Sequence, residues 1–414
     1  MSDLNIDAGR LQVNAFADSF GKPIDNALVR VLDQSTNAVL DTFRTNSVGQ
    51  TSIMELPAPN IDYSLGFGDQ QPYAEYNVAV EADGFEPFLI SGVQILPMST
   101  ALQNVVLRAK VTAPPQPTDI TIAPHTLWGT FPPKIPEPEV KELPFPSGLV
   151  VLPKPVIPEY IVVHLGVPED TSARNVWVPY KEYIKNVASC EIYSTWPVET
   201  IKANVIAINS FTLNRVFTEW YRGKGFDFTI TNSTAFDHSF SYGRNIYEEI
   251  SVVVDDLFST YLTKPNIQQP LLAQYCDGRR VVCTKGMQQW GSKDLGDMGY
   301  SSINILRNYY GYNVYLTSAE KVEGVPLSYG GTVLTLYSSG EAVRTIQNQL
   351  NAISDNYPAI SKVRADGVYG SQTQTAVKQF QQIFGLPVTG SVDFATWYQI
   401  SNIYVAVRNL AELQ

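Results

Sequence analysis

The sequence predicts a multidomain chain in which a β-sandwich, a proline-rich connector, an α+β domain and a helical module follow one another. Three observations predict it: alternating apolar residues near the start, a dense group of prolines, and helical spacing towards the end. We expect boundaries at 1–111, 112–158, 159–325 and 330–405. A length of 414 residues allows two to four domains.

The composition is that of a globular chain, with 44% hydrophobic and 17% charged residues. A net charge of −11 argues against sequence-independent binding of nucleic acid, which needs clustered Lys and Arg. Residues 1–9 lack the basic start and apolar core of a signal peptide, and no apolar run is long enough to span a bilayer. We therefore expect no nucleic-acid partner, no membrane partner and no N-terminal signal peptide.

The first domain shows the alternation of half-buried strands. Apolar and polar residues alternate over Leu11–Ala15 and Ala27–Val31, and turn signals stand at 21–23, 46–49 and 83–85. The order of these strands and turns resembles the transthyretin-like regulatory domains attached to carboxypeptidases and surface proteins. The resemblance implies a transthyretin-like β-sandwich.

Prolines dominate the connector and exclude a regular helix or a central strand from it. We expect an extended, semi-rigid segment with a solvated backbone. Ser147–Val151 is its longest apolar patch without proline. An endoprotease that needs an extended substrate would cut there, between Leu149 and Val150. A plain spacer is the alternative. The prolines are residues 114, 115, 117, 124, 132, 133, 136, 138, 144, 146, 153, 155 and 158.

The two remaining domains mix strand-like and helical patterns. Tyr160–Leu165 is strand-like, whereas Pro179–Ala188 and Ile201–Trp220 are helical. From 340 to 402 the apolar residues follow helical spacing, first at Val343, Ile346 and Leu350 and then at Ala376, Val377 and Phe380.

Three stretches of the helical module, Gly340–Asn351, Asp366–Gln381 and Gly385–Trp397, closely resemble the three-helix peptidoglycan-binding domain of many wall hydrolases. Most of their residues have structural roles, because the glycines take turns with positive φ and the apolar residues fill the core. Tyr369 and the loops between the helices are the candidates to contact glycan or stem peptide.

Three other stretches resemble the SpoIID-like family of sporulation lytic transglycosylases and amidase enhancers. They are Val178–Glu191, which precedes Trp196-Pro197, then Glu199–Ala207, and Lys285–Ser292. The glutamate that corresponds to Glu191 is the catalytic acid of that family, so the resemblance implies that Glu191 is catalytic here.

The resemblance also implies where substrate binds. Lys202 is a candidate to orient sugar hydroxyls or peptide carboxylates, and Asn209 and Ser210 occupy a groove position of the family. Gln289 and Trp290 suit a sugar site, because an amide binds hydroxyls and an aromatic face stacks on a pyranose ring. The chain departs from the family at Ile208–Phe211, where an Arg is common, and at the lead into Gly286, where a His is usual.

A lytic transglycosylase needs one carboxyl group where a hydrolase needs two. Protonated Glu191 would donate to the glycosidic oxygen between N-acetylmuramic acid and N-acetylglucosamine. The resulting carboxylate would take the proton of the muramic C6 hydroxyl, which closes a 1,6-anhydro ring. This demands a raised pKa, which we expect if Ile192, Trp196 and Trp290 keep water from the carboxyl group.

The chain has three cysteines, Cys190, Cys276 and Cys283. Cys276 and Cys283 bracket a short loop that a disulfide can close. A zinc site with His238 and Asp237 is the alternative, but this ligand set is thin. We expect free or paired thiols, and neither a metal nor a cofactor.

The domain order resembles that of clostridial spore cortex-lytic enzymes. It implies a zymogen in the spore, at the cortex or the boundary of coat and cortex, which acts on cortex peptidoglycan after a subtilisin-like germination protease has cut the connector. Two alternatives stay open. One is a non-catalytic wall-binding protein that stimulates an amidase. The other is a hydrolytic muramidase, which needs a second carboxylate such as Asp237 or Asp277 near Glu191.

Overall fold

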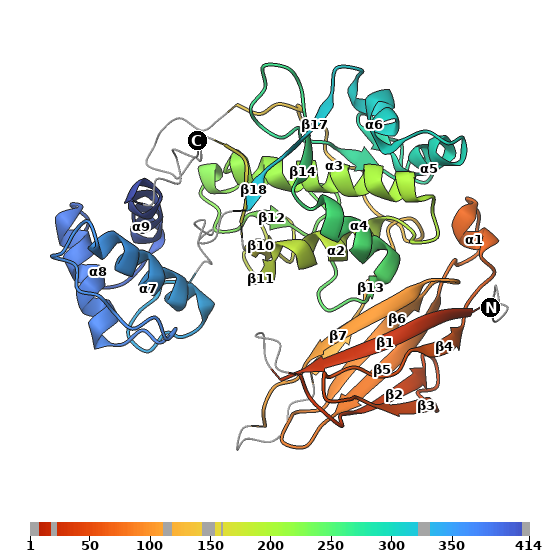
Figure 1. Ribbon diagram of the computed structural model, residues 1–414, viewed down its shortest axis with the longest axis horizontal. Coiled ribbons are helices and arrows are strands. Elements are labelled where there is room, and N and C mark those ends of the chain that lie inside the picture. Colours follow the sequence, from red (N-terminus) through yellow and green to blue (C-terminus); the bar gives the residue numbers. More distant parts are fainter. Residues whose placement is uncertain are drawn as a thin grey trace.

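The structure is a computed structural model that describes residues 8–17, 23–110, 118–142, 154–158, 160–321 and 332–407. The expected cleavage bond, Leu149–Val150, lies outside the described residues. Figure 1 shows the N-terminal sheets in red and orange, the central domain in green and cyan, and the helical module in blue on the far side of the central domain.

The N-terminal domain consists of two sheets that share one apolar core. Alternate residues of the first strand, Leu11, Val13 and Ala15, are fully buried, as the sequence pattern predicts. One sheet has the order β13-β7-β1-β4 and the other β3-β2-β5-β6-β8. Their strands are β1 (Ala8–Phe16), β2 (Leu28–Asp33), β3 (Val39–Arg44), β4 (Met54–Pro57), β5 (Ala74–Glu81), β6 (Phe88–Ile95), β7 (Thr100–Val106) and β8 (Thr118–Thr121).

The N-terminal domain is docked firmly on the central domain. Strand β13 (Ile246–Tyr247) belongs to the central domain but pairs antiparallel with β7 and so extends the first sheet. The short helix α1 (Asp62–Leu65) lies beside the central domain, where its Ser64 carbonyl accepts a 2.9 Å hydrogen bond from Trp196 Nε1. One hydrophobic cluster runs through both domains.

The central domain is built around a long helix, α3 (Val198–Phe217), which is buried along most of its length. The helix starts just after Pro197, because proline removes an N–H that the first turn does not use, and it packs against α2, α4, α5, α6 and β14. The other elements are β9 (Val156–Ile157), β10 (Tyr160–His164), β11 (Asn175–Pro179), α2 (Tyr180–Glu191), η1 (Arg222–Lys224), β12 (Ile230–Thr231), α4 (Glu248–Leu257), β14 (Thr260–Thr263), β15 (Tyr275–Cys276), β16 (Met287–Gln288), α5 (Gln289–Asp297), α6 (Ser302–Tyr310), β17 (Tyr315–Ser318) and β18 (Glu320–Lys321).

The C-terminal module has three helices, α7 (Glu341–Ser354), α8 (Ser371–Ile383) and α9 (Phe394–Val407), around a core of its own. Val343, Ile346, Leu350 and Phe380 are fully buried, as their spacing predicts. Trp397 of α9 packs edge-on against Trp177 of β11, with ring centroids 6.1 Å apart, and joins the module to the central domain.

The connector differs from the free spacer with solvated backbone that the prolines predict. It is extended, but β8 pairs in parallel with β6, and the segment that follows lies on the central domain. There Ile135 N donates to Ala235 O at 2.7 Å, and Leu272 N donates to Glu139 O at 2.8 Å. Prolines remove some N–H groups of the connector, and several of its other backbone groups bond to the central domain. Within the described ranges, no helix has both the length and the apolar character that a bilayer crossing demands.

Replacement of Phe380 by Ala should lower the free energy of unfolding of the C-terminal module by about 3–5 kcal/mol, because it leaves a cavity in a closed core. The matched control is Val388→Ala, at a residue that is 54% exposed, which should change it by less than about 0.5 kcal/mol. Urea unfolding of the full chain measures both variants. Equal effects of the two substitutions would contradict this assignment of the core.

Candidate active site

Glu191 is the last residue of α2, and its carboxyl group is buried. The helix ends there because Ile192 takes an extended conformation. Oε1 accepts a 2.8 Å hydrogen bond from the backbone N–H of Ser239, and Oε2 accepts bonds from Thr126 Oγ1 at 3.1 Å and Gln289 Nε2 at 3.2 Å. Gln289 Nε2 also donates to the carbonyl of Glu191 at 3.0 Å, which holds the end of the helix against α5.

Burial raises the pKa of the Glu191 carboxyl group above its ordinary value of 4.5. The ammonium of Lys134 and the three hydrogen bonds lower the pKa, but the loss of solvent has the larger effect. The position at a helix C-terminus acts in the same direction as burial, because the partial negative charge there disfavours an anion. The protein therefore shifts the balance of this carboxyl group towards its neutral form, relative to a glutamate in water.

The cavity beside Glu191 is small, with a volume of about 40 Å³. Roughly 10–15 Å³ of such space holds one water, so this cavity holds a few waters and no sugar ring. The connector forms one of its walls. The cavity is lined by Thr126, Phe131, Pro132 and Lys134 of the connector, and by Glu191, Thr234, Tyr275, Cys276, Asp277, Val281 and Gln289 of the central domain.

Lys134 brings a positive charge into this region. Its Nζ donates to the carbonyl of Asp237 and lies 5.2 Å from the ring centroids of both Phe211 and Tyr275. Burial lowers the pKa of Lys134 to about 8, although the negative charges of Glu191 and Asp237 oppose this shift.

The two carboxylates considered as partners of Glu191 are already engaged. Asp237 accepts from Arg215 Nε at 2.7 Å and from the Tyr221 hydroxyl at 2.6 Å. Asp277 lines the cavity, but its oxygens accept the backbone N–H groups of residues 279, 280 and 281. Asp237 therefore belongs to a buried ion pair, and the Asp277 carboxylate holds the loop that follows β15.

The structure brings Gln289 and Glu191 together, but Trp290 lies apart from the cavity lining. Its ring packs against Trp196, with centroids 5.1 Å apart, and edge-on against Phe67 of the N-terminal domain at 6.0 Å. Both Trp196 and Trp290 are buried. The face that was expected to stack on a sugar is covered by aromatic neighbours.

Three other candidate residues also lie outside the cavity lining. Asn209 is buried, accepts from the Tyr180 hydroxyl at 2.5 Å and donates to Thr260 O at 2.6 Å. Ser210 donates to the carbonyl one turn earlier and accepts from Leu262 N, so its hydroxyl ties α3 to β14. Lys202 forms an ion pair with Glu199 at 2.8 Å on the same helix. In this structure Asn209 and Ser210 bond within the fold, and Lys202 bonds to a residue of its own helix.

Tyr369 is buried in the core of the C-terminal module, and its hydroxyl donates to Gly390 O at 3.1 Å. The side chain therefore fixes the turn before α9, and any contact with glycan falls to the loops around it.

Cys276 and Cys283 form a disulfide. The bond closes the loop that follows β15, and Cys276, Asp277 and Val281 of this loop line the cavity beside Glu191. His238, considered as a zinc ligand, packs against Tyr183 and has its Nδ1 3.1 Å from the Tyr183 hydroxyl. Within the described residues no group of three or more His, Cys, Asp or Glu is arranged to hold a metal ion.

Sequence reasoning missed Thr126, Lys134, Ser239 and Tyr275. Thr126 and Lys134 belong to the connector, where no pattern indicates which surface the segment covers. Ser239 acts through its backbone N–H, which any residue supplies. Tyr275 stands directly before Cys276, and this adjacency to the cysteine loop was the available signal.

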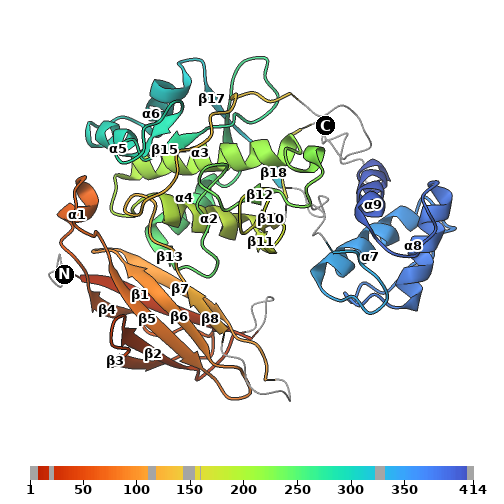
Figure 2. The ribbon, with the colours of Figure 1, turned by 180° about the vertical axis from the view of Figure 1, so that it is seen from behind.

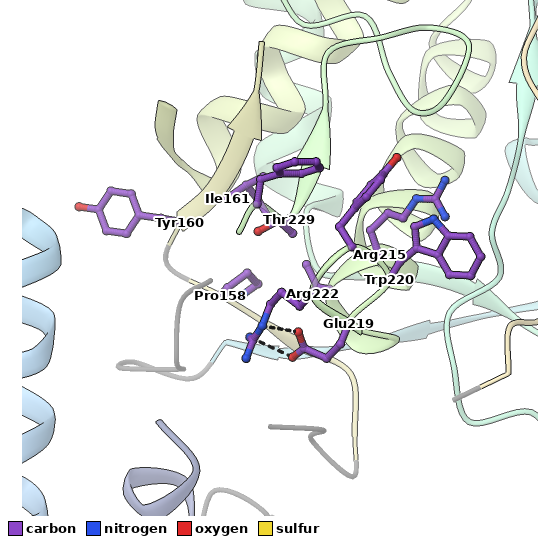
Figure 3. Close-up of a pocket in the computed structure, with 11 residues that line it drawn as sticks. Pro158, Tyr160, Ile161, Arg215, Glu219, Trp220, Arg222 and Thr229 are labelled. Carbon is purple, nitrogen blue, oxygen red and sulfur yellow. Dashed lines mark hydrogen bonds and ion pairs between the residues drawn. The ribbon is translucent and has the colours of Figure 1, made fainter. Parts of the chain in front are cut away.

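A second cavity, of about 30 Å³, lies at the C-terminal end of α3 and is drawn in Figure 3. Glu219 and Arg222 form a 2.9 Å ion pair at its edge. Burial raises the pKa of Glu219 to about 7, although the charge of Arg222 opposes this. Arg215 lines this cavity too and so links it to the Asp237 network.

Two regions of the chain match known protein families. Residues 169–256 match the SpoIID family, described as "Stage II sporulation protein", and residues 339–400 match the family described as "Putative peptidoglycan binding domain". Glu191 lies inside the first range, and Gln289 lies beyond it. The chain thus contains a SpoIID region and a C-terminal peptidoglycan-binding domain, a pair that relates it to sporulation and to cell-wall peptidoglycan.

Solved structures give partial matches. The SleB N-terminal domain is 32% identical over 18% of this chain and 93% of its own, with a TM-score of 0.16. The Bacillus anthracis TIE protein is 13% identical, over 25% of this chain and 17% of its own, and the minor pilin GBS52 of Streptococcus agalactiae is 11% identical, over 26% and 47%; both have TM-scores of 0.19. At such scores the likenesses establish neither fold nor function. No curated protein matches the chain.

The raised pKa of Glu191 should make folding stability depend on pH. Below the ordinary value of 4.5 the carboxyl group is protonated in both the folded and the unfolded chain and has no effect. As the pH rises above it, the unfolded chain loses this proton first, so the free energy of unfolding falls until the folded pKa is reached. Glu191→Gln has no ionisable group at this position and so lacks this pH-dependent loss. The free energy of unfolding of the variant should therefore rise relative to that of the wild type as the pH rises.

Urea unfolding of both proteins at pH 4.5 and at about pH 8 measures this difference. The control is Glu182→Gln, an exposed position on the same helix. A stability difference between Glu191→Gln and wild type that stays constant or shrinks with rising pH would contradict the raised pKa.

Proposed function

We propose that this protein is a peptidoglycan lytic transglycosylase of the spore cortex, similar to the clostridial enzyme SleC, and that it is made as a zymogen. It cleaves the bond between N-acetylmuramic acid and N-acetylglucosamine during germination and leaves 1,6-anhydro ends. The observation that carries the proposal is the buried carboxyl group of Glu191, which lines a cavity and whose pKa burial raises above its ordinary value.

The chemistry follows from this protonation state. Neutral Glu191 donates its proton to the glycosidic oxygen as the bond to C1 of the muramic residue breaks. The carboxylate that remains then accepts the proton of the C6 hydroxyl of the same residue, whose oxygen attacks C1 and closes the anhydro ring. Gln289 and the Ser239 N–H, which already bond to the carboxyl oxygens, stabilise the anion between the two steps.

The alternative of a hydrolytic muramidase has less support. It needs a second carboxylate to activate water or to attack carbon, and Asp237 and Asp277 are both held by their own partners. The alternative of a wall-binding amidase enhancer requires no buried acid at residue 191, whereas Glu191 is buried and its pKa is raised.

The zymogen part of the proposal has two supports. The cavity beside Glu191 has no room for a sugar ring, and part of its wall comes from the connector. A cut by a subtilisin-like germination protease between Leu149 and Val150 would separate residues 1–149 from the SpoIID region and the peptidoglycan-binding domain. We place the enzyme in the spore, at the cortex or at the boundary of coat and cortex, where its substrate lies.

Glu191→Gln should lower the rate of cortex digestion about 100-fold or more, because a general acid contributes roughly 10²–10⁴-fold and the amide donates no acidic proton. Protein cleaved in the connector is incubated with spore cortex, and the released fragments are weighed by mass spectrometry. An anhydro end is lighter than a reducing end by one water. Glu182→Gln, on the exposed side of α2, is the matched control and should retain full activity.

Undiminished digestion by Glu191→Gln would overturn the catalytic assignment. Reducing ends without anhydro ends would replace transglycosylation by hydrolysis. Release of fragments only after addition of an amidase would favour the enhancer.

A further inference from the structure

One segment of the connector covers the approach to Glu191. Residues 125–142, here called the strap, begin with a turn at 126–128 and then run over the central domain, and Figure 2 shows this amber trace beside β15 and α3. At its start Thr126 donates to Glu191. At its end the backbone of Lys141 bonds to Gln269.

The strap is held chiefly by side-chain amides of the central domain that form hydrogen bonds with its backbone. Gln274 Nε2 donates to Ile135 O at 2.8 Å, and Gln274 Oε1 accepts from Glu137 N at 3.0 Å. Gln269 brackets Lys141 in the same way, at 2.8 and 2.9 Å. Two buried side-chain amides therefore bind carbonyl and N–H groups that lie in sequence along the strap.

Charged side chains reinforce this hold. Glu137 accepts from Arg215 NH2 at 2.6 Å, and Glu139 pairs with Lys264 at 2.5 Å. The ammonium of Lys134 lies between the rings of Phe211 and Tyr275, close to the Glu191 cavity. The strap thus places a cation where the substrate of the proposed reaction has to lie.

Of two groups under the strap, the Gln274 amide is bonded only to the strap and the buried Tyr275 hydroxyl has no partner among the described residues. A buried amide or hydroxyl without a partner is unfavourable. Removal of the strap therefore leaves Gln274 and Tyr275 in need of a ligand that offers hydrogen-bonding groups along an extended chain.

We propose that the strap is an internal pseudosubstrate, that the groove it fills is the cleft for the glycan strand, and that Gln274 binds an N-acetyl group of that strand once the strap has left. The inference rests on the proposed function and adds the inhibitory element and a substrate-binding residue. An N-acetylated glycan carries amide carbonyls, amide N–H groups and hydroxyls along an extended chain, which are the kinds of group that Gln274 and Gln269 bind in the strap.

The place of the strap in the chain agrees with this role. The expected cut at Leu149–Val150 follows the strap, so the strap would stay joined to the N-terminal domain after cleavage. That domain is held by hydrogen bonds and packing, including the pairing of β13 with β7. Cleavage converts an internal occupant into a separate chain, which a long polymeric substrate can displace.

The test weakens the strap in the uncut, full-length protein. Lys134→Ala combined with Glu137→Ala removes two of the side chains that anchor the strap and substitutes no residue of the central domain. The probe is the soluble trimer of N-acetylglucosamine, and its binding is measured by calorimetry beside the rate of cortex digestion. The apparent affinity of a site falls in proportion to the fraction of molecules in which the site is open. Because the weakened strap leaves the groove open more often, the double variant should bind the trimer about tenfold more tightly than the wild type.

The controls separate this effect from others. Glu142→Ala alters an exposed charge of the strap and should bind like the wild type. The deacetylated trimer, which has amines in place of acetamido groups, should not gain affinity. Gln274→Ala in the double variant should lose about tenfold in affinity for the trimer, because a buried hydrogen-bonding partner is gone, and Gln274→Asn should lose less. The C-terminal module is the same in all of these proteins, so its own binding cancels in the comparison.

Equal binding of the trimer by the wild type and the double variant, with thermal unfolding showing that both are folded, would overturn the inference. An unchanged affinity in Gln274→Ala would remove the role of Gln274. If the affinities differ as expected but no form of the protein digests cortex, the proposed enzymatic function is wrong. The inference that the strap fills a glycan-binding groove would still hold.

Discussion

The structure depends on one physical constraint, which is that a carboxyl group is kept from water at the end of a helix. Glu191 is placed by α2, covered by its neighbours and bonded to Ser239, Thr126 and Gln289. Each of these hydrogen bonds lowers the pKa of the acid, but together they lower it by less than burial raises it. The chemistry proposed for the protein follows from this balance, because an acid that has already lost its proton has nothing to donate.

The same burial explains why the domains are joined so closely. Water is kept from Glu191 partly by Thr126 and Phe131 of the connector, which line its cavity, while Phe67 of the N-terminal domain covers Trp290 nearby. The first domain is bonded to the central one through a shared sheet and a shared core. The packing of the connector and the N-terminal domain against the central domain therefore has two results. It covers the approach to Glu191, and it keeps water from the carboxyl group. A substrate that takes the place of the strap has to exclude water as well as the strap does.

The parts of this arrangement that the sequence predicts are those governed by local pattern. Apolar spacing predicts α2 and α3 within a few residues of where they lie and indicates α7 and α8, while α9 is expected from the resemblance to a three-helix module. The order of motifs indicates that Glu191 and Gln289 belong to one site. The strap was not predicted, because prolines impose an extended backbone without indicating which surface it contacts. Asn209, Ser210 and Tyr369 were assigned to binding from their positions in the families that the chain resembles, and sequence alone does not show that their polar atoms bond to Thr260, Ile206 and Gly390.

The protonation state of Glu191 tests the account most directly. Infrared difference spectra between the wild type and Glu191→Gln, recorded as a function of pH, isolate the carboxyl band of this one residue. The account predicts that the band of the neutral acid persists at pH values above 4.5, the ordinary pKa of a glutamate. A residue 191 that ionises at or below that value would contradict it, because the group would then reach its substrate as an anion.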